Sequence, residues 1–390
     1  MEQRAVIIVG SGPAGAATAL GIAARDSELA ARTLLLDKAV HPRDKVCAGG
    51  VIPKGVARLA ALAVSLDVPH VRVDAASVRV PGAARVLVSA DDLCRVVRRR
   101  EFDARLAWTA RDRGVELREG ERVTHLARDG RGIRVETAAR AYWAPIVVGA
   151  DGSGSLVRRA LVGPSGAPIG RAVMCDVPVT ETSWDGYAAR RYDFDFTACA
   201  RGLRGYRWVF PCVIDGVPHA NVGVYALPPV EGTRLKAELT ETLADVGAAL
   251  RSWQAFPIHT YAPGAPVSAP GVVLVGDAAG VDPLMGEGIS FSLEYGLLAA
   301  DAIVAAHARD GRAFAGYARA VHRGPIGRKL RFLGRAARVF YGRAGGIAFH
   351  LAAASPRAQA VGLKWYNGVD GLDERPVLPL AARFLLGRAL

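Results

Sequence analysis

The sequence predicts a two-lobed α/β (α+β) fold, built from a discontinuous Rossmann-like domain, an inserted antiparallel sheet and a helical C-terminal region. Near the start of the chain, a glycine-rich turn joins a buried strand to an alanine-rich helix. A second strand, Gly-Asp turn and helix begin near residue 272, and the region between has short alternating segments rich in Tyr, Phe, Trp and Val. The expected boundaries are residues 1–75, 90–168 and 265–310 for the Rossmann-like domain, 76–89 and 169–264 for the inserted sheet domain, and 311–390 for the helical region.

The first unit opens with Val6–Val9, an apolar run without polar alternation that is typical of a strand buried on both faces. Gly10, Gly12 and Gly15 follow, and an alanine-rich helix is expected over residues 16–25. Gly10 would form the tight turn, Gly12 would let the backbone approach a pyrophosphate, and Gly15 would let the helix pack on the strand. The helix N-terminus then offers N–H groups and partial positive charge to phosphates.

The second strand of this unit, Thr33–Leu36, ends on Asp37, at the spacing of an acid that binds a ribose diol. A glycine pattern alone is weak, since an ordinary βαβ turn can carry it. Here the glycine pattern follows a strand and precedes a helix, and the next strand ends on the acidic residue Asp37. This combination favours a dinucleotide site.

Composition sets the broad class. The 390 residues are 51% hydrophobic and 22% charged, as in globular proteins. Five scattered cysteines without a CxxC pair predict a reducing, cytoplasmic setting and no metal site. The first strand begins too early for a signal peptide, and no apolar run has the length of a membrane span.

The net charge of +13 is concentrated near the C-terminus. Residues 311–369 hold eleven Lys and Arg and no Asp or Glu. This uneven charge indicates an anionic partner, which could be a membrane surface, a nucleic acid or an anionic substrate. Nucleic acid is not expected, because the segment matches no reading motif. Residues 327–349 interleave cations with apolar side chains, as in a helix lying peripherally on the inner face of a membrane, although a helical cap with solvated arginines has the same pattern.

The remaining helices, strands and loops are predicted from the positions of glycine and proline and from the periodicity of apolar residues. Proline, charges and paired glycines make residues 41–51 a shaped loop. Helices are expected over residues 55–63, 93–113 and 233–250, from Ile289 onward and after residue 313. Strands are expected within residues 71–88, 115–117, 123–126, 133–136, 145–149 and 272–275, and in the antiparallel sheet of residues 170–261.

Three turns follow buried strands, at residues 10–15, 149–154 and 276–280. Such turns meet at the carboxyl edge of an open α/β sheet, where ligands bind. Only the first has the full fingerprint, so one dinucleotide is expected, and the late Gly276-Asp277 turn favours a flavin. Asp277 would accept a hydrogen bond from a ribityl hydroxyl, unless it only caps a helix. The helix from Ile289 would direct its positive end at an electron-rich ring edge.

Seven motifs are spread over residues 4–301: Gly10-x-Gly12-x-x-Gly15, Pro42-Arg43-Asp44-Lys45-x-Cys47-x-Gly49-Gly50, Arg99-x-x-Phe102-Asp103, Gly149-Ala150-Asp151-Gly152, Tyr206-x-Trp208-x-Phe210-Pro211, Gly276-Asp277-Ala278-Ala279 and Gly286-Glu287-Gly288-Ile289. Taken together, these motifs resemble the geranylgeranyl reductase family of para-hydroxybenzoate hydroxylase-like flavoproteins.

The resemblance implies an FAD site and an apolar substrate pocket. The expected cofactor-binding residues are Gly10, Gly12, Pro13, Ala14, Gly15, Asp37, Lys38, Arg43, Cys47, Ala48, Gly49, Arg99, Asp151, Gly152, Gly276, Asp277, Gly286, Glu287, Gly288 and Ile289. Cys47, Gly49 and Gly50 would lie by the isoalloxazine ring and, with Tyr206, form the catalytic set; Tyr206, Trp208, Phe210 and Pro211 would line the substrate pocket.

The residues themselves leave alternatives open. Aromatic side chains at alternate strand positions share a face, and they could be plain sheet core. Cys47 could be an inert small residue. Arg99 has the fork shape that suits a pyrophosphate, but within Arg98–Arg100 it could also belong to a solvated helix face.

The expected function is an FAD-dependent reductase of carbon–carbon double bonds in a hydrophobic, prenyl-like substrate, with NAD(P)H or a small electron carrier as reductant. Ile289-Ser290, where aromatic hydroxylases commonly have asparagine, and the aromatic motif favour reduction over oxygenation. The Trp-x-Trp-x-Ile-Pro signature of flavin-dependent halogenases is absent from the sequence. Two alternatives remain: a monooxygenase of the same fold, and a non-catalytic flavin-containing electron carrier at a membrane surface.

Overall fold

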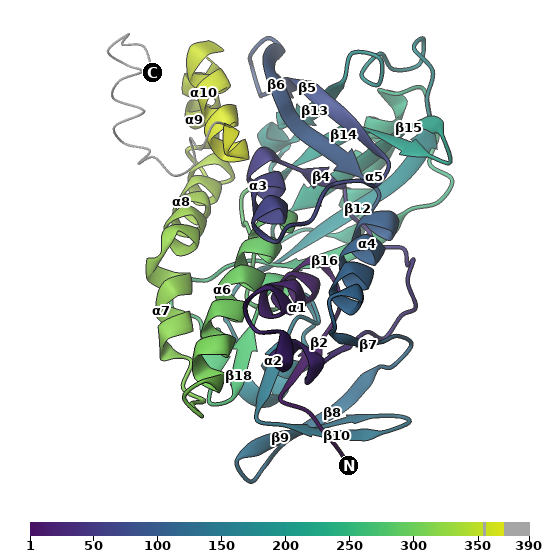
Figure 1. The fold of residues 1–390 in the computed structure, drawn as a ribbon. Helices are drawn as coiled ribbons and strands as arrows, with labels where there is room; N and C mark the ends of the chain where they lie inside the picture. Colours follow the sequence, from purple (N-terminus) through teal and green to yellow (C-terminus); the bar gives the residue numbers. More distant parts are fainter. Residues whose placement is uncertain (354–355, 370–390) are drawn as a thin grey trace.

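The computed structural model describes residues 1–353 and 356–369. Its first sheet has six strands in the order β17-β18-β11-β2-β3-β7 (Figure 1). All neighbours are parallel except β17 and β18. The strands are β2 (Val6–Val9), β3 (Thr33–Leu36), β7 (Glu116–Arg118), β11 (Ile146–Gly149), β17 (Ser268–Ala269) and β18 (Val272–Leu274). The residues of β2, β3, β11 and β18 are buried throughout, as their unbroken apolar sequences predict.

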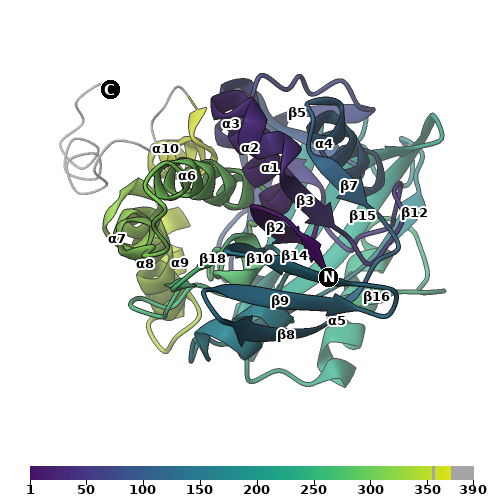
Figure 2. The same ribbon diagram turned by 60° about the horizontal axis from the view of Figure 1, so that its bottom comes forward.

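Helices cover one face of this sheet, and a small four-stranded layer, antiparallel except for its β1–β10 pair, covers the other (Figure 2). The helices are α1 (Pro13–Arg25), α2 (Ser27–Ala31), α4 (Arg99–Asp112) and α6 (Ile289–His307). The small layer consists of β1 (Glu2–Gln3), β10 (Ala141–Ala144), β9 (Gly132–Thr137) and β8 (Val123–Asp129). A Cβ at Gly296 of α6 would lie 2.5 Å from the Cβ of Ala17, so small side chains let α1 and α6 pack closely.

The second sheet has eight strands in the order β16-β12-β15-β14-β13-β5-β6-β4. Neighbours are antiparallel except β13 and β5. The strands are β4 (Gly50–Val51), β5 (His70–Arg79), β6 (Val86–Val97), β12 (Ile169–Pro178), β13 (Arg191–Asp195), β14 (Gly205–Ile214), β15 (Val217–Ala226) and β16 (Gln254–His259). Helix α5 (Gly232–Ala244) packs Leu235, Leu239 and Leu243 on one face, and the other face carries an aromatic core.

Several expected boundaries are wrong. Helix α4 begins at Arg99, not at residue 93, because Leu93–Val97 continue β6 and pair with β5. The β5–β6 hairpin therefore extends on both sides of the 76–89 segment expected to join the inserted sheet. Helix α5 ends at Ala244, six residues before the expected end. Helix α1 begins at Pro13 and α3 spans Pro53–Ala61.

The C-terminal region is helical as expected, with α7 (Ala315–Arg323), α8 (Pro325–Phe340), α9 (Gly345–Ala353) and α10 (Pro356–Asn367). Helix α7 lies beside α6, and α8, α9 and α10 continue from it toward the eight-stranded sheet, where α10 lies beside β6 (Figure 1). The part of the expected region over residues 370–390 lies outside the described residues. In the described part of the chain, one helix, α6, has the length and apolar composition of a membrane span, and it is mostly buried inside the protein.

Candidate active site

A single cavity of about 700 Å³ runs from the carboxyl edge of the six-stranded sheet to the aromatic face of the eight-stranded sheet. It brings together most of the residues predicted from sequence. Those that line it are Gly10, Gly12, Pro13, Ala14, Asp37, Lys38, Arg43, Cys47, Ala48, Gly49, Gly50, Arg99, Asp151, Gly152, Tyr206, Trp208, Phe210, Asp277, Gly286, Glu287, Gly288 and Ile289. Gly15, Gly276 and Pro211 do not line it.

Two glycines of the first turn, Gly10 and Gly15, are required by close packing of the protein backbone, whereas Gly12 leaves open space for a ligand. Gly10 has φ +101°, and a Cβ there would collide with the Ala150 carbonyl. A Cβ at Gly15 would collide with the Gly10 carbonyl, so Gly15 serves helix packing. At Gly12 the nearest atom to an added Cβ is the Arg43 guanidinium, 3.7 Å away. Gly12 also precedes α1 without a side-chain cap, so the first helical N–H groups remain open to an anion.

Asp37 is held beside this turn at the end of β3. Its carboxylate accepts hydrogen bonds from Ser11 N at 2.9 Å, Ser11 Oγ at 2.6 Å and Ala39 N at 2.9 Å. Burial alone would raise the pKa of Asp37, but these bonds and the charge of Arg43 hold it below its usual value. Asp37 is therefore an ionised acceptor in the pocket wall. Ser11 and His41, whose Nε2 lies 2.8 Å from Ser11 Oγ, support it and were not predicted as site residues.

A buried carboxylate that sequence reasoning did not assign to the site organises the two predicted arginines. Asp103 of α4 is fully buried and accepts two hydrogen bonds from Arg99, at 2.6 and 2.8 Å. The Arg43 guanidinium lies 3.2 Å from the same carboxylate. The side chain of Arg99 is 9% exposed and that of Arg100 is 49% exposed. Arg99 thus faces the pocket rather than solvent, which excludes a solvated helix face for it.

The three turns converge as predicted. Val275 N donates to Gly149 O at 2.9 Å, and Ala150 N donates to Val9 O at 2.9 Å. Asp277 accepts from Ser153 Oγ at 2.9 Å, so the second and third turns are joined by side chains. No side chain caps the 3₁₀ turn that contains Asp277, so helix capping is not its role. The carboxylate of Asp151, in contrast, accepts hydrogen bonds from Leu156 N and Val157 N, so it stabilises the turn in which it lies.

The loop around Cys47 joins the two ends of the cavity. Gly49 has φ +78°, and a Cβ there would collide with the Val97 carbonyl. A Cβ at Gly50 would lie 3.2 Å from Cys94 Sγ and 3.4 Å from the Phe210 ring, so the loop lies directly against the aromatic face. Cys47 is half-buried, and its sulfur accepts from Gly49 N at 3.4 Å.

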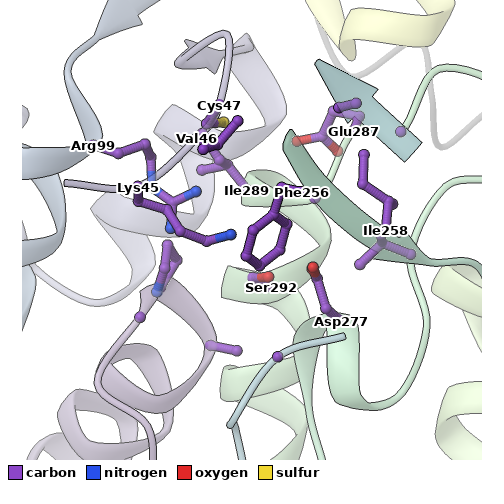
Figure 3. A pocket seen from close by; sticks show the side chains of 18 of the residues that line it. Lys45, Val46, Cys47, Arg99, Phe256, Ile258, Asp277, Glu287, Ile289 and Ser292 are labelled. Atoms are coloured by element: carbon purple, nitrogen blue, oxygen red, sulfur yellow. The ribbon is translucent and has the colours of Figure 1, made fainter. Parts of the chain in front are cut away.

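Lys45, in the same loop, was not predicted as a site residue although it stands in the cysteine motif. Its Nζ lies over the Phe256 ring, 2.7 Å from the centroid, inside the cavity (Figure 3). Burial lowers the pKa of Lys45 to about 7, against the opposing charge of Asp277. The only feature of the sequence that could have identified Lys45 as a site residue is its position in the motif, two residues before Cys47.

Aromatic side chains from neighbouring strands form the far end of the cavity. Tyr206, Trp208 and Phe210 of β14 point to one face, and Pro211 is excluded because adjacent strand positions alternate. Tyr192 stacks on Phe210 with centroids 5.1 Å apart. The Tyr206 hydroxyl donates to Met285 O at 2.6 Å, so its proton is engaged in fixing the loop before α6. The aromatic rings of β13 and β14 therefore belong to the hydrophobic core of the sheet and also line the cavity.

The last turn of α10 also closes this chamber, which no sequence motif signalled. Tyr366 and Asn367 line the cavity. The Tyr366 hydroxyl donates to Asp282 at 2.7 Å, and Asn367 Nδ2 donates to Tyr192 at 3.0 Å and to Leu93 O at 3.2 Å. The C-terminal helices are therefore part of the site.

Comparison with known proteins identifies relatives over most of the chain, although no protein-family model matches. A menaquinone reductase of Mycolicibacterium smegmatis is 30% identical over 335 residues, which cover 77% of this chain and 76% of the relative. A digeranylgeranylglycerophospholipid reductase of Methanococcus vannielii is 27% identical over 316 residues, 77% of this chain and 76% of the relative.

Solved structures share the fold. A geranylgeranyl bacteriochlorophyll reductase-like protein from Thermoplasma acidophilum has a TM-score of 0.70 at 19% identity, covering 94% of this chain and all of that one. The flavin-dependent brominase Bmp2 has a TM-score of 0.73 at 18% identity, with 94% of each chain covered. The motifs, the converging turns and the identity to reductases over three quarters of the sequence place this chain in the geranylgeranyl reductase-like family of FAD-dependent oxidoreductases.

Proposed function

We propose that this protein binds FAD and saturates carbon–carbon double bonds in the isoprenoid part of a hydrophobic substrate. The observation that carries the proposal is the continuity of the cavity. One end has the glycine turn, the open N-terminus of α1 and Asp37, and the other end is an aromatic chamber. The volume of about 700 Å³ lies in the range of cofactor and ligand sites.

The residues present fit FAD. Gly12 leaves space at the end of α1, and Arg43 and Arg99 are fork-shaped donors suited to a pyrophosphate. Asp277 and the N-terminus of α6 lie where the ribityl arm and the ring would follow. When bound and reduced, FAD supplies a hydride.

The protein's own part is positioning and exclusion of water. A Cβ added at Gly50 would lie 3.4 Å from the Phe210 ring, so an alkene held on the aromatic wall would lie close to the Cys47–Gly50 loop. Apolar rings of β13 and β14 favour an isoprenoid chain and leave few polar groups to hydrate it. Holding the reacting carbons in one orientation can supply several kcal/mol of the barrier.

The test uses the anaerobically reduced holoenzyme mixed with a menaquinone or with digeranylgeranylglycerophospholipid. We expect the flavin absorbance to return without oxygen and the product to gain two hydrogens in mass. A flavin that stays reduced with both substrates would contradict the proposal, and a product that gains one oxygen in air would indicate a monooxygenase. A Trp208→Ala variant should raise KM at least tenfold, whereas Trp253→Ala, at a half-exposed side chain outside the cavity, is the matched control.

The reductant that we propose is NAD(P)H or a small electron carrier. The sequence has one dinucleotide fingerprint, so NAD(P)H would reach the same cavity rather than a domain of its own. Anaerobic mixing of the oxidised holoenzyme with NADH, NADPH or a reduced carrier separates these donors by the rate of flavin bleaching.

We further propose that α8 contacts an anionic membrane surface, from which such a substrate would be drawn. Arg328, Phe332, Arg335 and Val339 lie on one exposed face of this helix, and Arg338 is exposed beside them. In α9, Ile347 is also exposed. Cations interleaved with exposed apolar side chains, in a segment without acids, complement anionic headgroups.

A further inference from the structure

Glu287 carries a buried oxygen that the surrounding protein does not satisfy. It lies in the loop before α6, and Figure 3 shows its carboxyl turned into the cavity. Its Oε1 accepts from Ser290 N at 2.8 Å and from Ser290 Oγ at 3.0 Å. Its Oε2 is shielded from solvent and has no hydrogen-bond partner among the described residues. The structure thus fixes the carboxyl through one oxygen and leaves the other unpaired at the cavity wall.

The surroundings of Glu287 favour its neutral form. The titratable groups that act on it or feel its charge are Lys54, Cys94, Tyr206, Asp282 and Tyr366. Lys54 is the one cation among them, and its Nζ lies 2.6 Å from the Glu294 carboxylate. Burial raises the pKa of Glu287, and the charge of Asp282 acts in the same direction, against the Ser290 hydrogen bonds and Lys54.

The position of Glu287 links the two ends of the cavity. Gly286 and Gly288, on either side of it, line the cavity where the cofactor ring is proposed to lie. Met285, two residues before it, accepts the hydroxyl of Tyr206 from the aromatic wall. The loop is therefore anchored to the substrate chamber, and Glu287 lies in the cavity wall between the proposed ring site and that chamber.

We propose that Glu287 is the proton donor of the reaction and protonates the substrate carbon next to the one that receives the hydride. The inference rests on the proposed reductase function. One alkene carbon gains a hydride from reduced flavin, and the hydride's electron pair forms the first new C–H bond. The other carbon gains a proton from the Glu287 carboxyl, and the π electron pair of the alkene forms the second C–H bond. Glu287 is left as a carboxylate and regains its proton from water, and the oxidised flavin is reduced again by the external donor.

The test compares Glu287→Gln with the wild-type holoenzyme. Glutamine keeps the acceptor for Ser290 N but has no acidic proton, so folding and flavin content should be retained. We expect anaerobic reoxidation by menaquinone or digeranylgeranylglycerophospholipid to slow by about 100-fold or more, with reduction by dithionite unchanged. The wild-type rate should fall as the pH rises through the pKa of Glu287, and the variant should lose this dependence. Asp301→Asn, at an exposed carboxylate of α6 that pairs with Arg25 outside the cavity lining, is the control.

Infrared spectroscopy gives a second readout that needs no turnover. The holoenzyme should show the carbonyl band of a protonated carboxylic acid that shifts in D₂O, disappears as the pH rises through the pKa of Glu287 and is missing in Glu287→Gln. An unchanged rate or an unchanged band in Glu287→Gln would overturn the inference and leave the reductase function standing. A rate lost in Cys47→Ser but kept in Glu287→Gln would overturn it as well. Wild-type flavin that neither substrate reoxidises would overturn both proposals together.

Discussion

Asp103 is the residue whose removal tests the proposed cofactor site most directly. Its fully buried carboxylate binds Arg99 through two hydrogen bonds and lies 3.2 Å from Arg43. Both arginines line the cavity. An Asp103→Ala change would leave the Arg99 guanidinium, only 9% exposed, without its counter-charge.

The expected cost follows from that burial. Removing one partner of a buried ion pair typically costs about 3–5 kcal/mol of unfolding free energy. Arg43 is more exposed and can turn toward water, so we expect about 3 kcal/mol for Asp103→Ala. Asp301, at 60% exposure, pairs with Arg25 on the surface, and the same substitution there should cost about 0–1 kcal/mol.

The assay is urea unfolding of the flavin-free proteins, followed by titration with FAD. We expect FAD affinity to fall at least tenfold in Asp103→Ala, because Arg43 and Arg99 lose the group that orients them. In a double variant, Arg99→Met with Asp103→Leu, no uncompensated buried charge remains, so stability should recover while FAD affinity stays low. An Asp103→Ala protein as stable as Asp301→Ala would refute the reasoning.

The other predictions concern the loop, its lysine and the basic helix. Gly49→Ala should cost more than 3 kcal/mol and release flavin, because strain at φ +78° adds to the collision with a backbone carbonyl, whereas Gly82→Ala at φ +70° has open space and should cost about 1 kcal/mol; urea unfolding compares them. The folded-state pKa of Lys45 is about 7, below its ordinary 10.5, so between these values the unfolded chain binds more protons. Unfolding free energy of the flavin-free protein, relative to Lys45→Met, should therefore rise with pH from 7 to 10, and a flat difference would contradict the burial of this ammonium. Reversing the charge of Arg335 and Arg338 to Glu should abolish salt-sensitive co-sedimentation with anionic vesicles and leave NAD(P)H oxidation in detergent unchanged; retained binding would exclude α8 as the contact.

The sequence by itself determined the Rossmann-like half. The apolar β-branched run Val6–Val9, followed at once by a glycine turn, indicates a strand with both faces covered, and a glycine that must adopt φ +101° leaves a local signature that needs no partner. The convergence of the three turns also followed from the sequence, because parallel strands end at one edge. Boundaries follow less well from the sequence: it predicts a helix over Leu93–Val97, whereas pairing with β5 makes this short segment a strand.

Tertiary structure alone decided how the pocket is completed. Asp103 reaches Arg43 from another part of the chain, Tyr366 closes on Asp282 across 84 residues, and Glu287 keeps one oxygen unpaired in a space that no local pattern defines. Hydrogen bonding, burial and the pKa shifts they cause depend on which distant groups meet. Sequence periodicity fixes which side of an element is apolar, but only the packed chain determines which polar atom is left facing the cavity.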